Sequence, residues 1–238
     1  MRHHIAKFKD AHIRWDLLKL GLDVVTGVAL IALAVTTLHS AITRSAQATS
    51  AQRATVVEMA PTTIALSDRA IKHPGATVAI VEFSDFECPF CARFAREVFP
   101  DLKSQLGALG ITFDYRHSPS NSHPNALKAA IAAECAHDQN KFWEMHDALF
   151  ADSSSLKDGH WSRYATAVGL DNDKLTACLA DVSRSTLDDD RMQAKRFEVP
   201  GTPTFLIGTV QSDGTISVTR KLLGVQTVDQ LRTQIRGL

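Results

Sequence analysis

Apolar residues in the central part of the chain follow two spacings, one typical of buried strands and one typical of helices. Residues 76–85, ATVAIVEFSD, are mostly β-branched or apolar and predict a buried central strand. From Pro89 onward, apolar side chains recur every three or four positions, which predicts a helix that begins at this proline. The first strand therefore leads directly into a helix. A second strand is predicted over Gly110–His117.

The second half of the chain is dominated by helical patterns. Residues 124–196 contain several such segments in succession. Two short apolar strands follow, over 199–208 and 215–224, and a terminal helix over 227–237 has Thr227 as its expected N-cap. The predicted order is β, α, β, a helical block, β, β, α. This order indicates an α/β fold class.

The N-terminal part is different, because residues 24–43 carry no charge. Together with residues 20–22 they reach roughly the 20 residues that a membrane-spanning helix needs. Lys and Arg are denser before this stretch, which predicts that the N-terminus is inside and the body outside. We expect a cytoplasmic tail over 1–19, a transmembrane signal-anchor helix over 20–42, a linker over 43–61 and a folded domain over 62–238.

Two other interpretations of the N-terminus stay open. Residues 46–48 match the A-x-A pattern of a signal-peptidase site, and cleavage there would give a soluble periplasmic protein. The apolar segment can also be a buried core helix of a cytosolic protein. We expect the anchor, which places a single-pass protein in the inner membrane with its folded domain in the oxidising periplasm.

Charge and cysteine content narrow the functional classes. Lys plus Arg equals Asp plus Glu at 26 each, whereas nucleic-acid binders carry a basic excess or a basic face. We therefore expect no nucleic-acid partner. The four cysteines permit three pairings.

The pair Cys88-x-x-Cys91 is compatible with a metal site, a structural disulfide or a redox centre. A zinc ribbon needs a second close pair, and the other two cysteines are too far apart to supply one. A structural bond that closes so short a loop stabilises little. At a helix N-terminus, however, free N–H groups and the helix dipole favour a thiolate, which suits redox chemistry. We expect no metal site, although four scattered histidines are available as ligands: His123, His137, His146 and His160.

Two motifs carry a resemblance to a known family. VEFSDFECPFC over 81–91, together with VPGTPTF over 199–205, resembles the thioredoxin superfamily in its DsbA-like branch of exported thiol:disulfide oxidoreductases. The resemblance covers residues 62–238. It implies a thioredoxin-like fold with an inserted helical domain at about 121–197.

The resemblance also implies roles for five residues. Cys88 matches the nucleophile and Cys91 the buried resolving thiol. Glu82, six residues before Cys88, matches a buried acid beneath the active site that exchanges a proton with the resolving thiol. Pro203 matches the cis-proline that faces the cysteines. Thr202 precedes it and offers backbone groups to an extended substrate.

The residues around the cysteines tune the redox potential in this family. The dipeptide between them is Pro89-Phe90, and strong oxidants of the branch have histidine where this chain has Phe90. Asp85 and Glu87 are interpreted as solvated loop charges that raise the pKa of Cys88 slightly.

The remaining cysteines, Cys135 and Cys178, lie on two predicted helices of the insertion. Some relatives have a second, non-catalytic disulfide in this region, and the resemblance implies one here. The alternative is two unpaired buried thiols.

The function implied is thiol:disulfide exchange with protein or peptide thiols, most simply as an oxidant that a membrane redox partner reoxidises. No cofactor is expected. Two alternatives are a reductase or isomerase kept reduced by an electron donor, and a non-catalytic peptide-binding module with a thioredoxin fold.

Overall fold

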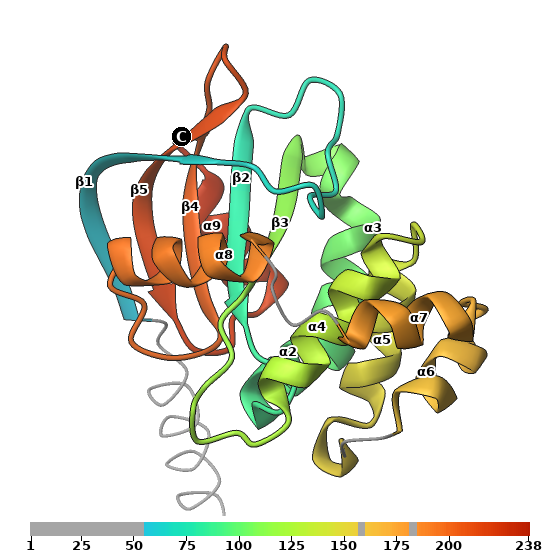
Figure 1. Ribbon diagram of the computed structural model, residues 1–238. Coiled ribbons are helices and arrows are strands. Elements are labelled where there is room, and N and C mark those ends of the chain that lie inside the picture. The colour runs from blue at the N-terminus through green and yellow to red at the C-terminus, as the bar shows by residue number, and fades with distance from the viewer. Residues whose placement is uncertain (1–54, 157–159, 181–184) are drawn as a thin grey trace, which may run out of the picture. The chain divides into compact units, whose positions relative to one another are not determined.

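The computed structural model describes residues 55–156, 160–180 and 185–238. Five strands form one sheet in the order β1-β5-β4-β2-β3 (Figure 1). Their bounds are β1 (Thr55–Ala65), β2 (Val78–Ser84), β3 (Ile111–His117), β4 (Thr204–Val210) and β5 (Thr215–Leu223). The central strand β2 is buried along its whole length, because it pairs in parallel with β3 and antiparallel with β4.

Helices cover both faces of the sheet. On one face, α2 (Pro89–Glu97), α3 (Phe99–Leu109) and α9 (Val228–Ile235) pack against alternate residues of the strands. On the other face, α8 (Ser185–Arg196) runs across the strands (Figure 1). Successive side chains of β2 point to opposite faces. Glu82 therefore points to the same face as Ile80, toward α2.

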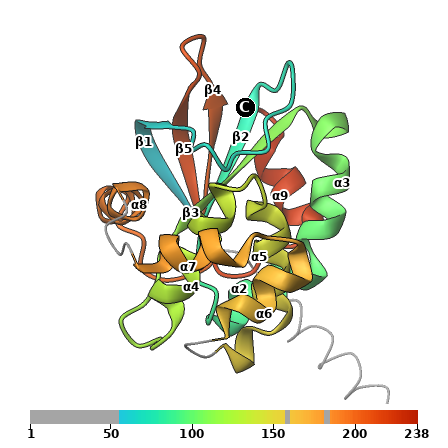
Figure 2. The same ribbon diagram turned by 45° about the vertical axis from the view of Figure 1, so that its right-hand side comes forward.

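The helical insertion lies between β3 and β4, where the sequence predicts it. Besides α8 it contains α4 (Ala126–His137), α5 (Phe142–Ala151), the short 3-10 helix η1 (Ser153–Ser155), α6 (Trp161–Val168) and α7 (Asn172–Ala180). Figure 2 shows these helices grouped at one end of the sheet. Alanines on the buried face of α4 let the neighbouring helices approach closely. The thioredoxin-like α/β fold with a helical insertion agrees with the sequence prediction.

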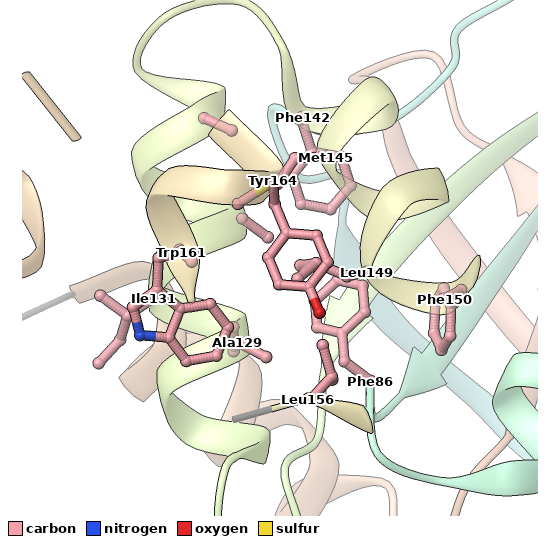
Figure 3. Packing of buried hydrophobic residues seen from close by; sticks show 14 of the residues in the cluster. Phe86, Ala129, Ile131, Phe142, Met145, Leu149, Phe150, Leu156, Trp161 and Tyr164 are labelled. Atoms are coloured by element: carbon pink, nitrogen blue, oxygen red, sulfur yellow. The ribbon is translucent and has the colours of Figure 1, made fainter. Parts of the chain in front are cut away.

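Two features stabilise the insertion, one within it and one that holds it to the rest of the domain. One is a disulfide between Cys135 on α4 and Cys178 on α7. The other is an apolar cluster in which Phe86, from the turn before the cysteines, packs among insertion side chains such as Phe150, with ring centroids 4.8 Å apart (Figure 3). The turn that carries Cys88 is therefore anchored in the core of the insertion.

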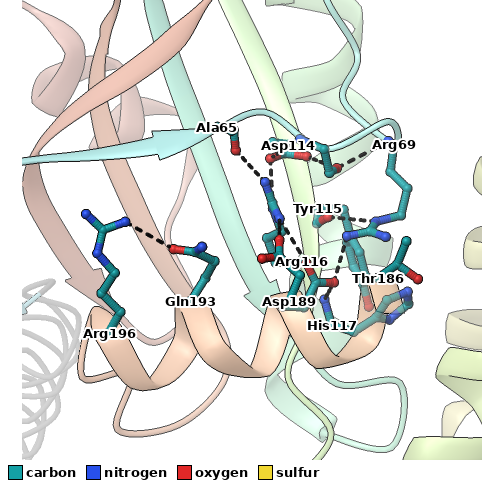
Figure 4. A network of polar contacts seen from close by, with 12 residues as sticks. Ala65, Arg69, Asp114, Tyr115, Arg116, His117, Thr186, Asp189, Gln193 and Arg196 are labelled. Carbon is teal, nitrogen blue, oxygen red and sulfur yellow. Dashed lines mark hydrogen bonds and ion pairs between the residues drawn. The ribbon is translucent and has the colours of Figure 1, made fainter. Parts of the chain in front are cut away.

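A buried ionic network lies between the sheet and α8 (Figure 4). Asp190 on α8 accepts hydrogen bonds from Arg69 at 2.6 Å and from Arg116 at 3.0 Å. Glu134 on α4 accepts from Arg69 at 2.8 Å and lies 3.0 Å from the Nε2 atom of His117. Burial disfavours the Glu134 carboxylate, but His117 and Arg69 hold its pKa well below the usual range. The network joins α4 and α8 to β3 and to the segment before β2.

The N-terminal boundary of the domain differs from the prediction. Residues 43–61 were expected to form a linker, yet β1 begins at Thr55 and pairs antiparallel with β5, with Thr55 opposite Leu223. This strand is at the sheet edge and mostly exposed, so its sequence lacks the apolar run of a buried strand. The predicted membrane span over 20–42 lies outside the described residues. Within the described ranges, no helix is both long and apolar enough to cross a membrane.

Candidate active site

The two cysteines of the C-x-x-C motif lie at the N-terminus of α2. Cys88 is the N-cap residue, and Pro89 occupies the first turn, where its missing N–H costs no hydrogen bond. Both cysteines are free thiols, so the structure represents the dithiol form. Cys91 lies one turn into the helix and is fully buried, whereas Cys88 retains 5% exposure. Both thiols are therefore buried, and only Cys88 keeps a small solvent-accessible area.

The loop before β4 faces Cys88. The Thr202–Pro203 peptide bond is cis, as the resemblance implies. The Sγ atom of Cys88 lies 3.3 Å from the backbone oxygen of Thr202, and the protonated thiol donates a hydrogen bond to it. Two motifs that are more than a hundred residues apart in sequence therefore meet at one sulfur atom.

The surroundings of Cys88 favour its thiolate. The Cys91 thiol is the main group that stabilises the negative charge, and the Thr202 side chain and the backbone N–H groups of Cys91 and Phe90 add to it. Together they outweigh burial and lower the pKa of Cys88 to about 5. At neutral pH almost all of the reduced Cys88 is therefore the nucleophilic thiolate.

The surroundings of Glu82 and Cys91 favour the protonated form of each side chain. Burial is the main cause that raises the pKa of Cys91 well above its usual value, and the nearby Cys88 and Glu82 raise it further. Burial also raises the pKa of Glu82 to about 8, although the Ser84 hydroxyl opposes this. Glu82 is thus mostly a neutral carboxylic acid at pH 7, next to a thiol that holds its proton.

Two hydroxyl groups share this buried space. Ser84 follows Glu82 by two positions on β2 and points to the same face, and Tyr115 is the β3 partner of Glu82. The Oε1 atom of Glu82, the Ser84 hydroxyl and the Tyr115 hydroxyl are all buried without a hydrogen-bond partner at normal distance. The Ser84 hydroxyl is nevertheless close enough to lower the pKa of Glu82, Cys91 and Tyr115. The buried region beside Cys91 is therefore polar, and some of its polar atoms lack a hydrogen-bond partner.

The expectation that Asp85 and Glu87 are solvated is wrong. Asp85 is 2% exposed, and its carboxylate accepts hydrogen bonds from the backbone N–H groups of Glu87 and Ser120, each at 2.8 Å. The Glu87 carboxylate accepts from the backbone and side-chain nitrogens of Asn125, the latter at 2.9 Å. Both carboxylates thus bind the loop between β3 and α4 to the turn before Cys88.

Phe90 points away from this polar network. Its side chain is 60% exposed, so the position before Cys91 in the C-x-x-C motif is occupied by a solvent-facing apolar ring. Among the described residues, no group of three or more His, Cys, Asp or Glu side chains is arranged to hold a metal ion.

Sequence reasoning missed Ser84 and Tyr115. It interpreted Asp85 as solvated and considered His123 only as a possible metal ligand, whereas the Nδ1 atom of His123 lies 2.8 Å from the Oδ2 atom of Asp85. Ser84 was detectable from the two-residue period of the strand, because it shares a face with Glu82. Tyr115 required the register of β2 and β3. Two hydrogen-bond partners of Asp85, Ser120 and His123, lie in a loop more than thirty residues away. No local sequence pattern predicts these contacts.

Comparisons with known proteins agree with this geometry. A family model described as thioredoxin matches residues 65–222. The chain belongs to the thioredoxin family. Among solved structures, DsbA2 of Pseudomonas aeruginosa is 25% identical with a TM-score of 0.57, covering 75% of this chain and 95% of that one. Wolbachia pipientis alpha-DsbA1 shares the fold at 20% identity and a TM-score of 0.55, covering 75% and 92%. This thioredoxin-family domain has the DsbA-like form.

Curated relatives are sodium/proton antiporters. NhaA 3 of Salinispora tropica is 37% identical over 150 residues, and NhaA 1 of Salinispora arenicola is 36% identical over 148. Each match covers 60% of this chain and 22% of the antiporter. The thioredoxin-family chain therefore spans about a fifth of the length of these relatives.

Proposed function

We propose that the protein is a thiol:disulfide oxidoreductase that oxidises the thiols of exported proteins through Cys88 and Cys91. The observation that carries the proposal is the difference between the two cysteines: the pKa of Cys88 is lowered to about 5 and that of Cys91 is raised. The Cys88 thiolate exists only in the reduced form. Stabilising it favours the dithiol over the disulfide, and this raises the reduction potential.

The reaction begins with the disulfide form. A substrate thiolate attacks the Sγ atom of Cys88, the Cys88–Cys91 bond breaks, and a mixed disulfide forms. The electron pair of the broken bond goes to Cys91, whose buried sulfur takes up a proton. Glu82, a neutral acid up to about pH 8, is the proton donor.

The second step releases the product. A second substrate thiolate attacks the substrate sulfur of the mixed disulfide, and Cys88 leaves as a thiolate that is stable at neutral pH. The substrate has lost two electrons and gained a disulfide, and the enzyme has gained a dithiol. Thr202, beside cis-Pro203, offers its backbone to an extended substrate.

The proposed location rests on the N-terminal sequence, and the proposed redox partner rests on the family resemblance. The apolar stretch over 20–42 supports a periplasmic domain with an inner-membrane anchor, and a membrane protein that accepts electrons would reoxidise the dithiol. The antiporter relatives do not make transport part of the proposal, since the likeness covers only 22% of their length.

Trapping of the mixed disulfide tests the proposal. A Cys91→Ala variant cannot form the Cys88–Cys91 bond, but its Cys88 thiolate can attack the disulfide of an oxidised substrate, from which one substrate sulfur leaves as a thiolate. Because Cys91 is absent and cannot attack the mixed disulfide, such adducts should accumulate through Cys88 and disappear on reduction. The control is Cys88→Ala, which should form none. Equal adduct formation by the two variants contradicts the assignment of roles. A native pool that alkylation finds entirely in the dithiol form contradicts the oxidant direction.

A further inference from the structure

Asp85 lies in the turn that leads to Cys88 and contacts the backbone of that turn. Its backbone oxygen accepts a hydrogen bond from the Cys88 N–H at 3.1 Å, and its carboxylate holds the Glu87 N–H in the same turn. The Asp85 side chain has no exposed surface. A buried carboxylate requires compensation, and so close to Cys88 its charge alone would disfavour the thiolate.

The compensating group is His123, in the loop between β3 and α4. Its Nδ1 atom lies 2.8 Å from the Oδ2 atom of Asp85, and its ring is 30% exposed. The hydrogen bond to Asp85 is the main cause that raises the pKa of His123, and the charges of Asp85, Cys88 and Glu87 raise it further. The imidazolium therefore interacts with the turn's two carboxylates and with the Cys88 thiolate.

We propose that His123 is a positioning residue for the Cys88 reaction, which holds the Asp85 turn and, when protonated, supplies positive charge that favours the reduced form. The inference rests on the proposed function. It ties oxidising strength to pH through a residue outside the C-x-x-C motif. Phe90, between the two cysteines, is an exposed apolar residue and supplies no charge to Cys88. In this proposal the positive charge near the Cys88 sulfur comes from His123, in the loop between β3 and α4.

The sign of the effect follows from linkage. The thiolate is present in the dithiol and absent from the disulfide, so the His123 pKa is higher in the dithiol. At pH values between the His123 pKa of the disulfide form and that of the dithiol form, reduction of the disulfide is accompanied by uptake of an extra fraction of a proton on His123. The potential of the unaltered protein therefore falls more steeply with pH there than that of a variant without the imidazole. Above both midpoints the two proteins converge.

The test compares glutathione equilibria of the full chain and its His123→Asn variant at pH 6 and pH 9. Asparagine can still donate a hydrogen bond to Asp85 but carries no charge. We expect the variant's equilibrium with glutathione to shift roughly threefold to tenfold toward the disulfide at pH 6, about 15–30 mV, and little at pH 9. The matched control is His160→Asn, because His160 is exposed at the start of α6, and it should leave both values unchanged.

Two outcomes of the glutathione measurements overturn the inference. One is an unaltered potential at pH 6 in His123→Asn, and the other is an equal shift at both pH values, which would mean a merely structural role. If the unaltered protein does not exchange with glutathione at all, the proposed function itself fails. Titration of the His123 ring by NMR in the unaltered protein is an independent check that needs no variant to fold. A midpoint that is the same in dithiol and disulfide forms also contradicts the inference.

Discussion

Glu82 and Tyr115 are direct partners in the parallel register of β2 and β3, and each ends in a buried oxygen without a hydrogen-bond partner. Both side chains point to the face on which α2 carries Cys91. A carboxyl group and a phenol that are left unsatisfied in a protein interior lower its stability. Their position beside Cys91 places this unsatisfied polar pair where the proposed mechanism requires a proton donor.

Replacement of Glu82 by glutamine should slow the reaction and stabilise the fold. Without the acid, protonation of Cys91 during mixed-disulfide formation should slow at least tenfold at pH 7. Stopped-flow reduction by a dithiol peptide measures this. The difference from the unaltered protein should shrink above about pH 8, where Glu82 is ionised. The exposed Glu97 supplies the control Glu97→Gln, which should keep the normal rate.

The stability effect of Glu82→Gln has a defined pH dependence. The pKa of Glu82 is about 8 in the folded protein and 4.5 without the fold's influence, so the folded state binds more protons in that window. The free energy of unfolding of the native protein therefore falls as pH rises from about 4.5 to 8, by up to roughly 1.4 kcal/mol per pH unit. In urea titrations, the free energy of unfolding of the variant should exceed that of the native protein by a few kcal/mol at pH 8 and equal it at pH 4. The opposite slope would contradict the burial argument.

Tyr115→Phe should stabilise the domain or leave it unchanged. The substitution removes a buried hydroxyl that has no partner, so we expect a gain of about 0–2 kcal/mol in unfolding free energy. Tyr164→Phe is the matched control, because the Tyr164 hydroxyl donates to Asp152 at 2.8 Å. That variant should lose about 0.5–1.5 kcal/mol. If both variants lose stability equally in urea titrations, Tyr115 has a partner after all.

Phe90→His should make the cysteine pair more oxidising. An imidazole beside Cys88 can donate a hydrogen bond or carry positive charge, and both favour the thiolate. Phe90 is 60% exposed, so solvent screens the effect, and we expect a rise on the order of 30 mV in a glutathione titration. The neutral variant Phe90→Leu should stay near the native potential. A lowered potential in the histidine variant would mean that the ring does not reach Cys88.

Asp190→Asn should destabilise the domain without altering its redox potential. Asp190 compensates both Arg69 and Arg116 in the buried network, and removing one partner of such a group costs about 3–5 kcal/mol. Asp189→Asn is the control, since that half-exposed side chain lies 3.2 Å from Arg116 and should contribute less than about 1 kcal/mol. Thermal unfolding and glutathione titration measure the two effects. A loss of similar size in both variants would contradict the role of burial.

Much of the site could be predicted because its signals are local. The C-x-x-C pair follows an apolar run and precedes a helix, and Glu82 lies on the strand with a fixed spacing to Cys88. The GTPTF motif placed the second loop opposite the cysteines. These features depend on residues close together in sequence or on a motif that is specific to the family.

The predictions for β1 and for Asp85 are wrong because both depend on contacts between residues that are far apart in sequence. The strand β1 was interpreted as linker because only Ile64 is buried in it, so its pattern is that of an exposed segment. Asp85 was interpreted as solvated because its partners, Ser120 and His123, lie 35 and 38 residues away. Polar residues are identified as buried only when their partners are known, and those partners are set by tertiary structure.

The bond between Cys135 and Cys178 changes what a protease can reveal about this domain. The two cysteines are 43 residues apart, and the helices α5, α6 and most of α7 lie between them. A single cut anywhere between the two cysteines leaves two fragments that are still covalently joined. Such a nicked molecule migrates as one band on a denaturing gel and separates into two only after reduction. A cut elsewhere in the chain separates the fragments at once, so two gels show without sequencing whether a cleavage lies inside or outside the loop that this disulfide closes.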